Sequence, residues 1–501
     1  MPESVFEPEF HELSTDGGWG AERLESLFRR FTQLSNPIFL DGCGEVKVEE
    51  ELNRFSYLAA EPIAELKIDR NDSFAFEQLR ELHQRYPFHR VGGLPPFQGG
   101  IAGLIAYEFN SRLEKVVAAQ VDEFQVPQLV LFVYDVVLAI DHAQNRAWLI
   151  SQGWPQSESS KRRECAVSRL RQFRELIEME DPVELDCKLE QRIELSEDVL
   201  NPLESTFELY SDFSRAQFLA MVQKTVDYIR AGDIFQANLS QRLLSPATKS
   251  PAELYLDLRS VNPAPFSAYF DFGEGQVISA SPERLVSMSK REIETRPIKG
   301  TRPRTHFPEV DLDTREALLN SEKDRAENTM IVDLLRNDLS RVAEPDSVHV
   351  SKLCGIEQFE NVFHLVSTIK ARLAEEFDAI DLIASLFPGG SITGAPKIRA
   401  MEIVSELEPT VRGAYCGSLG YVCPDGVMDF NILIRTITAK DGWWQIPVGG
   451  GIVSDSDPEK EYEETWAKAV GMLRAISRNR NIENRPEKPS IASDIRELPA
   501  V

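Results

Sequence analysis

Cysteines are few in this sequence, and long apolar runs are missing. Six cysteines are scattered along the 501 residues without a C-x-x-C pair, at Cys43, Cys165, Cys187, Cys354, Cys416 and Cys423. This scatter argues against a disulfide framework or a zinc site, and it is typical of a protein of the reducing cytoplasm. No stretch reaches about 18 consecutive apolar residues, and the N-terminus has no apolar run behind a basic start. The sequence therefore predicts neither a membrane span nor a secretory signal.

Basic residues are in the minority. Lysine and arginine together number 55 against 81 aspartates and glutamates, which gives a formal net charge of −26. Because no concentrated basic face offsets this charge, repulsion from phosphates argues against nucleic acid as a partner. An acidic protein can still bind an anionic substrate, but only in a pocket made locally positive by a metal ion, by Lys or Arg, or by backbone amides.

The chain divides by pattern into two regions and a tail. Residues 1–200 alternate apolar and polar segments, with a strand predicted over 129–140 and an acidic, linker-like stretch over 181–209. Residues 210–480 are denser in glycine-marked turns, and residues 481–501 are polar and proline-marked, as in a disordered tail. The patterns of the second region predict a strand over 430–437 and helices over 213–231 (N-cap Ser211 or Asp212), 313–339 and 458–477.

Two of the predicted helices each carry a pair of acidic residues three positions apart. The pairs are Asp324 with Glu327 and Glu461 with Glu464. Residues i and i+3 share a helix face, so each pair can direct two carboxylates into one cavity. Facing pairs could bind Mg²⁺, which prefers oxygen ligands. Taken alone, such pairs are more often solvated helix faces than metal ligands.

Two glycine-rich segments allow close approach to the backbone. Residues 387–397 place glycines before a predicted helix, which exposes N–H groups to an anion, but their spacing is not that of a P-loop. Gly449, Gly450 and Gly451 form the second segment. A tight turn is the simpler interpretation of each segment by itself.

Two cationic residues stand next to apolar segments. Arg435 lies within a predicted strand, where its guanidinium is either an exposed side chain or a bidentate clamp for a carboxylate. Lys299 stands between a predicted strand end and a glycine. A lysine desolvated at such a place has a lowered pKa and becomes a nucleophile. Without further context, a surface lysine at a turn is the commoner case.

Taken in order, many segments of residues 210–480 resemble the chorismate-utilising enzymes. They are GDIFQ (232–236), SPERL (281–285), PIKGT (297–301), AEN (326–328), IVDLLRND (331–338), HLVS (364–367), GAPK (394–397) and the Glu461/Glu464 pair. That family includes the large subunits of anthranilate synthase and aminodeoxychorismate synthase, and the isochorismate and salicylate synthases. In residues 1–200, NRFSY (53–57) and GGIAG (99–103) resemble the accessory domain of the aminating subunits.

The resemblance implies a fold, a metal and a pocket. The expected fold is α+β, with large antiparallel sheets packed as a sandwich and flanked by helices. Mg²⁺ is the expected cofactor, ligated by Glu327 and Glu464 with Asp324 and Glu461 close by. Chorismate is the expected substrate, and the pocket residues implied are Gly300, Thr301, His364, Ser391, Tyr415, Arg435, Gly449, Gly450 and Gly451. An arginine with backbone amides can bind one carboxylate while the metal neutralises the other.

Two positions discriminate between members of the family. Isochorismate and salicylate synthases have a water-activating lysine where this chain has Gln236, and an amide is no base at neutral pH, so ammonia is the implied nucleophile. Lys299 stands where aminodeoxychorismate synthases typically have lysine and anthranilate synthases alanine. In the mechanism proposed for that branch, the lysine attacks C2 while the C4 hydroxyl leaves, protonated by the residue matching Glu283. Ammonia then adds at C4, and the expected product is 4-amino-4-deoxychorismate, a precursor of p-aminobenzoate and folate.

The ammonia needs a source, and the G-x-C-x-G elbow of a glutamine amidotransferase is missing. The resemblance therefore implies a separate glutaminase subunit in a heterodimer. The Leu-Leu-Glu-Ser feedback segment of anthranilate synthases is replaced by Phe39-Leu40-Asp41-Gly42. Two alternatives stay open: an anthranilate synthase large subunit, and a catalytically inactive binding subunit, against which the retained Glu327, Glu464 and Lys299 argue.

Overall fold

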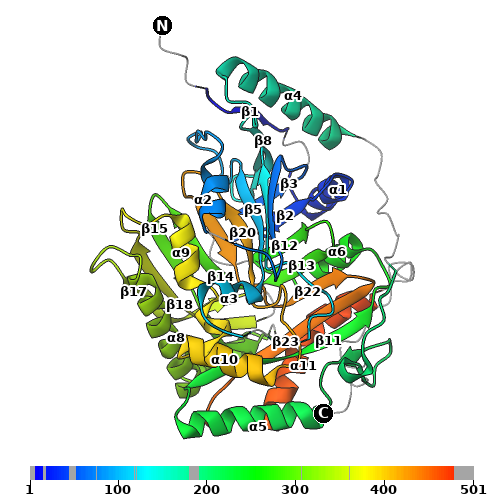
Figure 1. Cartoon of the computed structure of the whole chain (residues 1–501), viewed down its shortest axis with the longest axis vertical. Helices are drawn as coiled ribbons and strands as arrows, with labels where there is room; N and C mark the ends of the chain where they lie inside the picture. Colours follow the sequence, from blue (N-terminus) through cyan, green and yellow to red (C-terminus); the bar gives the residue numbers. More distant parts are fainter. Residues whose placement is uncertain are drawn as a thin grey trace.

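The computed structural model describes residues 6–14, 18–43, 52–74, 76–117, 119, 121–179, 191–305, 307–359 and 362–478. The predicted tail and Cys187 lie outside these ranges. Two large antiparallel sheets face one another, and helices flank them (Figure 1). This is the α+β sandwich expected for the chorismate-utilising enzyme fold.

Each sheet combines strands that are distant in the sequence. The larger sheet has the order β1 (Glu9–Glu12), β8 (Arg146–Ser151), β7 (Val136–Asp141), β3 (Phe55–Ala59), β2 (Ile38–Asp41), β12 (Phe266–Asp271), β13 (Gln276–Ser281), β22 (Thr436–Lys440), β23 (Trp443–Ile452), β11 (Gln236–Pro246), β10 (Tyr210–Ser211) and β9 (Asn201–Pro202), with β19 (Gly394–Ala395) beside β11. The smaller sheet has the order β16 (Ile298–Pro303), β18 (Val362–Arg372), β15 (Glu292–Arg296), β14 (Arg284–Ser289), β21 (Met428–Asn431), β20 (Ser418–Val422), β5 (Gly100–Ile105), β6 (Leu129–Tyr134) and β4 (Ala64–Ile68), with β17 (His349–Gln358) beside β18.

The two predicted regions share both sheets. In the larger sheet β2 pairs with β12, and in the smaller sheet β5 pairs with β20. Apolar side chains of both regions, among them Phe132 and Phe270, form one core between the sheets. The predicted division near residues 200–210 is therefore a division along the chain and not between two separate hydrophobic cores.

Helices cover the outer faces of the sandwich. The larger sheet packs against α1 (Ala21–Phe31), α4 (Ser159–Glu178), α6 (Pro251–Val261) and α11 (Pro458–Ser477). The smaller sheet packs against α2 (Phe76–Gln84), α8 (Glu322–Ser340) and α9 (Ala379–Leu386). The β11 end is covered by α5 (Arg215–Ala231) and α10 (Lys397–Leu407), and α7 (Pro308–Leu319) lies against β16, β17 and β18. Short helical turns are η1 (Tyr107–Phe109), α3 (Asn110–Leu113), η2 (Glu197–Val199) and η3 (Gly390–Ile392).

Several predicted elements are wrong in their bounds, for local reasons. The helix predicted over 313–339 is two helices, because Ser321 caps α8 by accepting a hydrogen bond from Asp324 N at 3.3 Å. The cap of α5 is Ser214, which forms a capping box with Gln217, and not Ser211 or Asp212. The strand predicted over 129–140 breaks at buried Asp135, where the chain passes from the smaller sheet to the larger one.

The helix predicted over 458–477 is confirmed as α11. Within the described ranges, no helix combines the length and the apolar composition that crossing a bilayer requires. The five cysteines of these ranges are free thiols.

Candidate active site

Lys299 lies on β16 with its amine directed to the turn η3. Its Nζ donates a hydrogen bond to the carbonyl oxygen of Ser391 at 2.8 Å. Burial lowers the pKa of Lys299, although the carboxylates of Glu327 and Glu283 act in the opposite direction. A larger fraction of the amine is therefore neutral, as a nucleophilic lysine requires.

Gln236 and the glycines of β23 lie against the same amine. The two nitrogens Gln236 Nε2 and Lys299 Nζ lie 2.1 Å and 3.6 Å from the position that a Cβ at Gly451 would occupy. Gln236 is only 1% exposed, and both atoms of its amide lack a hydrogen-bond partner within the described residues. At Gly449 a Cβ would meet the carbonyl oxygen of Leu239 at 2.2 Å. The glycines thus let β23 approach β11 closely at the place where the side chains of Gln236 and Lys299 both lie near Gly451.

Gly300 has a structural requirement of its own. Its φ of +82° is in the left-handed region, and a Cβ there would lie 2.9 Å from Asp324 Oδ1. Glycine at this position therefore lets β16 carry Lys299 past the first turn of α8.

Glu283 is a buried carboxyl beside this group. It is 3% exposed, and its Oε1 accepts a hydrogen bond from the backbone N–H of Ile298 at 3.2 Å. Burial raises the pKa of Glu283, and the shift is only partly offset by the Ser391 hydroxyl, the Ile298 N–H and the positive charges of Lys299 and Arg435. A carboxyl with a raised pKa holds its proton longer, which suits a general acid.

Thr301 and His364 face each other across β16 and β18. The Thr301 hydroxyl and His364 Nδ1 are 2.8 Å apart, and His364 Nε2 is buried without a partner among the described residues. Burial, with the nearby charge of Arg435, lowers the pKa of His364 to about 3. His364 is therefore neutral, with one ring nitrogen left for a ligand.

Arg435 does not lie within a strand, contrary to the prediction. The segment 432–435 carries the chain from β21 in the smaller sheet to β22 in the larger one, and Arg435 has a φ of +52°. Burial lowers the pKa of Arg435. Within the described ranges its guanidinium has no hydrogen bond or ion pair, so it is available to clamp a substrate carboxylate.

Ser391 and Tyr415 complete the predicted pocket. The Ser391 hydroxyl is buried and faces the carboxyl of Glu283, whose pKa it lowers. Tyr415 is 4% exposed and packs with its ring 5.9 Å from the guanidinium carbon of Arg412. Both side chains therefore lie in the interior, close to the segments that hold Lys299 and Gln236.

The predicted metal carboxylates come from α8 and α11. Atoms Glu461 Oε2 and Glu464 Oε1 each lie 3.5 Å from the position of a Cβ at Gly450, so both face β23. Burial raises the pKa of Glu327, with like charge from Asp324 and Glu464 acting in the same direction. The two acidic pairs are thus close enough to act on one another, across the two helices.

The expected Mg²⁺ would draw only part of its ligands from these carboxylates. Among the described residues, no group of three or more His, Cys, Asp or Glu side chains is arranged to hold a metal ion. Mg²⁺ usually keeps several waters and binds through one or two carboxylates together with substrate oxygens. Glu327 and Glu464 would supply such a partial shell.

Two cations near the carboxylates were not identified from the sequence. Lys468 Nζ forms an ion pair with Glu464 at 2.7 Å and donates to the carbonyl oxygen of Gly449 at 2.8 Å. Arg302 pairs with Asp324 at 2.7 Å. Lys468 could have been found as the i+4 partner of Glu464 on a predicted helix.

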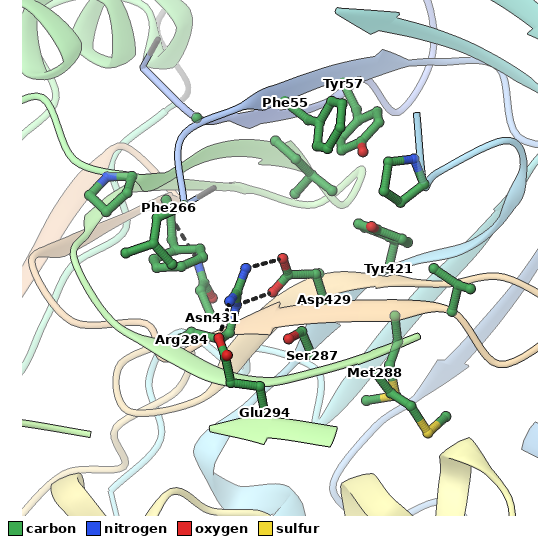
Figure 2. Close-up of a pocket in the computed structure, with 18 of the residues that line it drawn as sticks. Phe55, Tyr57, Phe266, Arg284, Ser287, Met288, Glu294, Tyr421, Asp429 and Asn431 are labelled. Atoms are coloured by element: carbon green, nitrogen blue, oxygen red, sulfur yellow. Dashed lines mark hydrogen bonds and ion pairs between the residues drawn. The ribbon is translucent and has the colours of Figure 1, made fainter. Parts of the chain in front are cut away.

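A cavity lies elsewhere, between the two sheets. Its volume is about 520 Å³, and it shares no lining residue with the predicted site. Figure 2 shows Arg284 at one side, in ion pairs with Asp429 and Glu294, with the aromatic rings of Tyr57 and Tyr421 also lining the space. Residues Leu40, Asp41 and Gly42, from the segment that departs from the anthranilate synthase feedback pattern, line it too. Arg284 follows Glu283 directly, so β14 separates this cavity from the candidate site.

Comparison with known proteins places the chain in a family. A family model described as chorismate binding enzyme matches residues 44–474. Anthranilate synthase component 1 of Thermus thermophilus is 41% identical over 410 residues, which cover 80% of this chain and 82% of that protein. Aminodeoxychorismate synthase component 1 of Escherichia coli K12 is 37% identical over 476 residues, which cover 92% and 97%.

The three-dimensional structure agrees with these sequence relatives. The crystal structure of anthranilate synthase component I from Streptococcus pneumoniae superposes with a TM-score of 0.72 at 35% identity, over 84% of this chain and 92% of that one. The chain therefore belongs to the chorismate binding enzyme family and is a chorismate-utilising enzyme.

Proposed function

We propose that this enzyme aminates chorismate at C4 to give 4-amino-4-deoxychorismate, on the route to p-aminobenzoate and folate. The observation that carries the proposal is Lys299, whose amine has a lowered pKa and lies beside Gln236. Sequence identity does not choose between the aminating branches, because relatives named for each are 41% and 37% identical. The choice rests on the nucleophile that the pocket holds.

The neutral amine of Lys299 would attack C2 of chorismate. As the C2–N bond forms, the double bond shifts and the C4 hydroxyl leaves as water with the proton of Glu283. The raised pKa of Glu283 keeps that proton available. Ammonia then attacks C4, the C2–N bond breaks, and the Lys299 amine returns to its neutral form. The proton lost by the added nitrogen restores Glu283, so chorismate and ammonia give product and water.

Substrate binding follows from charge. Arg435 would clamp one carboxylate of chorismate, and His364 offers a buried ring nitrogen that lacks a protein partner within the described residues, beside the Ser391 hydroxyl. When bound by Glu327 and Glu464, Mg²⁺ supplies the positive charge that neutralises the other carboxylate. This arrangement would let a protein with a net charge of −26 hold a dianion.

A separate glutaminase subunit would supply the ammonia. The support is the sequence, which lacks the nucleophilic cysteine elbow of a glutamine amidotransferase. Free ammonium at high concentration should therefore replace the partner in an assay.

A second candidate is anthranilate formation, which the 41% identity to the Thermus thermophilus protein favours. The two are separated by incubating the purified chain with chorismate, Mg²⁺ and ammonium. We expect a product that yields p-aminobenzoate only after an aminodeoxychorismate lyase is added. Fluorescent anthranilate as the main product would refute the proposal, and no turnover would favour an inactive binding subunit.

Lys299→Ala tests the covalent step. We expect formation of 4-amino-4-deoxychorismate to be lost or the product to shift towards anthranilate, because ammonia could then reach C2 directly. The matched control is Lys440→Ala, since Lys440 is a largely enclosed lysine, 8% exposed, on β22 away from the site, where its amine pairs with Glu274. An unchanged rate and product for Lys299→Ala would contradict the nucleophilic role.

A further inference from the structure

A buried ion pair lies behind the candidate site. Arg412 and Glu408 are each 6% exposed. Arg412 donates from Nε to Glu408 Oε2 at 2.8 Å and from Nη2 to Glu408 Oε1 at 2.7 Å, which is a bidentate pair. Glu408 also accepts hydrogen bonds from the Ser240 backbone at 2.8 Å and the Ser240 hydroxyl at 2.9 Å. The carboxylate is thereby fully engaged, and it orients the arginine.

The remaining donors of Arg412 hold two segments of the site together. Nη2 donates to the carbonyl oxygen of Asn238 on β11 at 2.5 Å, and Nη1 donates to that of Ile392 on η3 at 3.3 Å. Asn238 is two residues from Gln236, and Ile392 follows Ser391, whose carbonyl oxygen holds the Lys299 amine. One guanidinium therefore links the strand of the discriminating glutamine to the turn that anchors the nucleophile.

The surroundings fix Arg412 from the other side. Its guanidinium lies 4.6 Å from the ring centroid of Tyr107 and 5.9 Å from that of Tyr415. Its backbone N–H and that of Gly413 donate to Glu108 at 2.8 Å and 3.0 Å. By contrast, η3 is a single short turn without a side-chain cap. Backbone pairing of β19 with β11 and the bond from Asn238 N–H to the carbonyl oxygen of Thr393 hold the chain just after η3, and Arg412 holds η3 itself at Ile392.

We propose that Arg412, oriented by Glu408, is a positioning residue that sets the Lys299 amine relative to Gln236 and the substrate. The inference rests on the proposed amination at C4. If η3 moves, the carbonyl oxygen of Ser391 moves with it, and the Lys299 amine is no longer positioned to attack C2 of chorismate. A displacement of about 1 Å can lower a rate about 10²-fold.

The readout must separate positioning from folding. We use the fraction of anthranilate in the total product, because this ratio does not depend on how much of the protein is folded. With a misplaced lysine, ammonia can compete for C2. The second readout is kcat per folded molecule, with the folded fraction measured by circular dichroism.

Arg412→Lys is the first variant, and Arg242→Lys is its matched control. Lysine keeps the charge beside Glu408 but cannot span both carbonyls with a planar fork. Arg242 lies on β11, the strand of Asn238, is 4% exposed, and is also bidentate to a carboxylate, that of Glu123, at 2.9 Å and 3.2 Å. Glu408→Gln is the second variant, which keeps Arg412 but weakens its orientation.

We expect Arg412→Lys to lower kcat per folded molecule about 10²-fold and to raise the anthranilate fraction, with Arg242→Lys unchanged in both. Glu408→Gln should shift both readouts in the same direction by a smaller factor, and it decides the question if Arg412→Lys does not fold. Wild-type values for the folded variants, or equal shifts in Arg242→Lys, would overturn the inference. If the wild-type enzyme itself makes only anthranilate, the proposed function fails. The positioning role of Arg412 is then tested by kcat per folded molecule alone.

Discussion

Replacement of Gly451 by alanine gives a sharp test of the site geometry. A Cβ there would lie 2.1 Å from Gln236 Nε2, far inside van der Waals contact. The atom that must move is the end of the Gln236 side chain, which is 1% exposed and has to repack inside the protein, so we expect a cost at the lower end for overpacking, about 1 kcal/mol of unfolding free energy. The φ of Gly451 is outside the left-handed region, so backbone strain adds nothing. Because Lys299 Nζ is 3.6 Å from the same point, we also expect kcat/KM to fall about 10²-fold.

Denaturant unfolding and steady-state kinetics measure the two effects. Gly450→Ala is the control, because its Cβ would meet Glu461 and Glu464 only at 3.5 Å, an ordinary contact, and we expect a stability change within about 0.5 kcal/mol. The double variant Gly451→Ala/Gln236→Ala removes the clash and should recover stability but not activity. The geometry is refuted if Gly451→Ala is as stable as Gly450→Ala, or if the double variant is no more stable than Gly451→Ala.

Three further perturbations probe protons and metal. Because burial raises the pKa of Glu283 above its usual value, wild-type kcat/KM should fall as pH rises through that raised pKa. Glu283→Gln should lower kcat by about 10²–10⁴-fold and remove this decline at high pH from the pH–rate profile. The pKa of His364 is lowered to about 3 in the folded state, whereas the unfolded state binds the proton below about pH 6.5. Between pH 6.5 and 4.5 the wild type should therefore lose about 2–3 kcal/mol of unfolding free energy, and His364→Gln should not. Denaturant titrations at several pH values measure this difference. Glu464→Gln should weaken activation by Mg²⁺ about 10–100-fold. Lys468→Met should strengthen this activation, because it removes the ion pair at 2.7 Å in which Lys468 competes with the metal for Glu464. Titrations of activity with Mg²⁺ should therefore shift in opposite directions for the two variants.

Local patterns were enough to predict several parts of the molecule. The periodicity and N-terminal signals of 458–477 define α11 because helix formation there depends on residues within a few turns. Family order in segments such as 281–285 and 297–301 pointed to the chorismate-utilising enzymes, which the comparisons bear out. The bounds of α7 and α8 were missed because the side-chain bond that caps α8 at Ser321 is visible only in the folded chain.

Other features depend on contacts between residues far apart in sequence. Arg435 was expected in a strand, since its neighbours are apolar, but those residues are buried where the chain crosses between the sheets and not along one of them. Each sheet also joins strands from before and after residues 200–210, through the pairing of β2 with β12 and of β5 with β20, which no local pattern predicts. An apolar run records burial and does not record the partner that buries it.

The sequence by itself determined the acidic charge, the kinds of chemical group and their order, with Lys299, Gln236 and Glu283 among them. Only the tertiary structure decided the surroundings of those groups: β16 packs the Lys299 amine against η3, a turn about 90 residues away, where the carbonyl oxygen of Ser391 accepts its hydrogen bond and burial lowers its pKa. Burial raises the pKa of Glu283 and lowers that of Lys299, and burial is a property of the packed whole. The proposed roles of nucleophile and acid depend on this burial, which the sequence alone does not show.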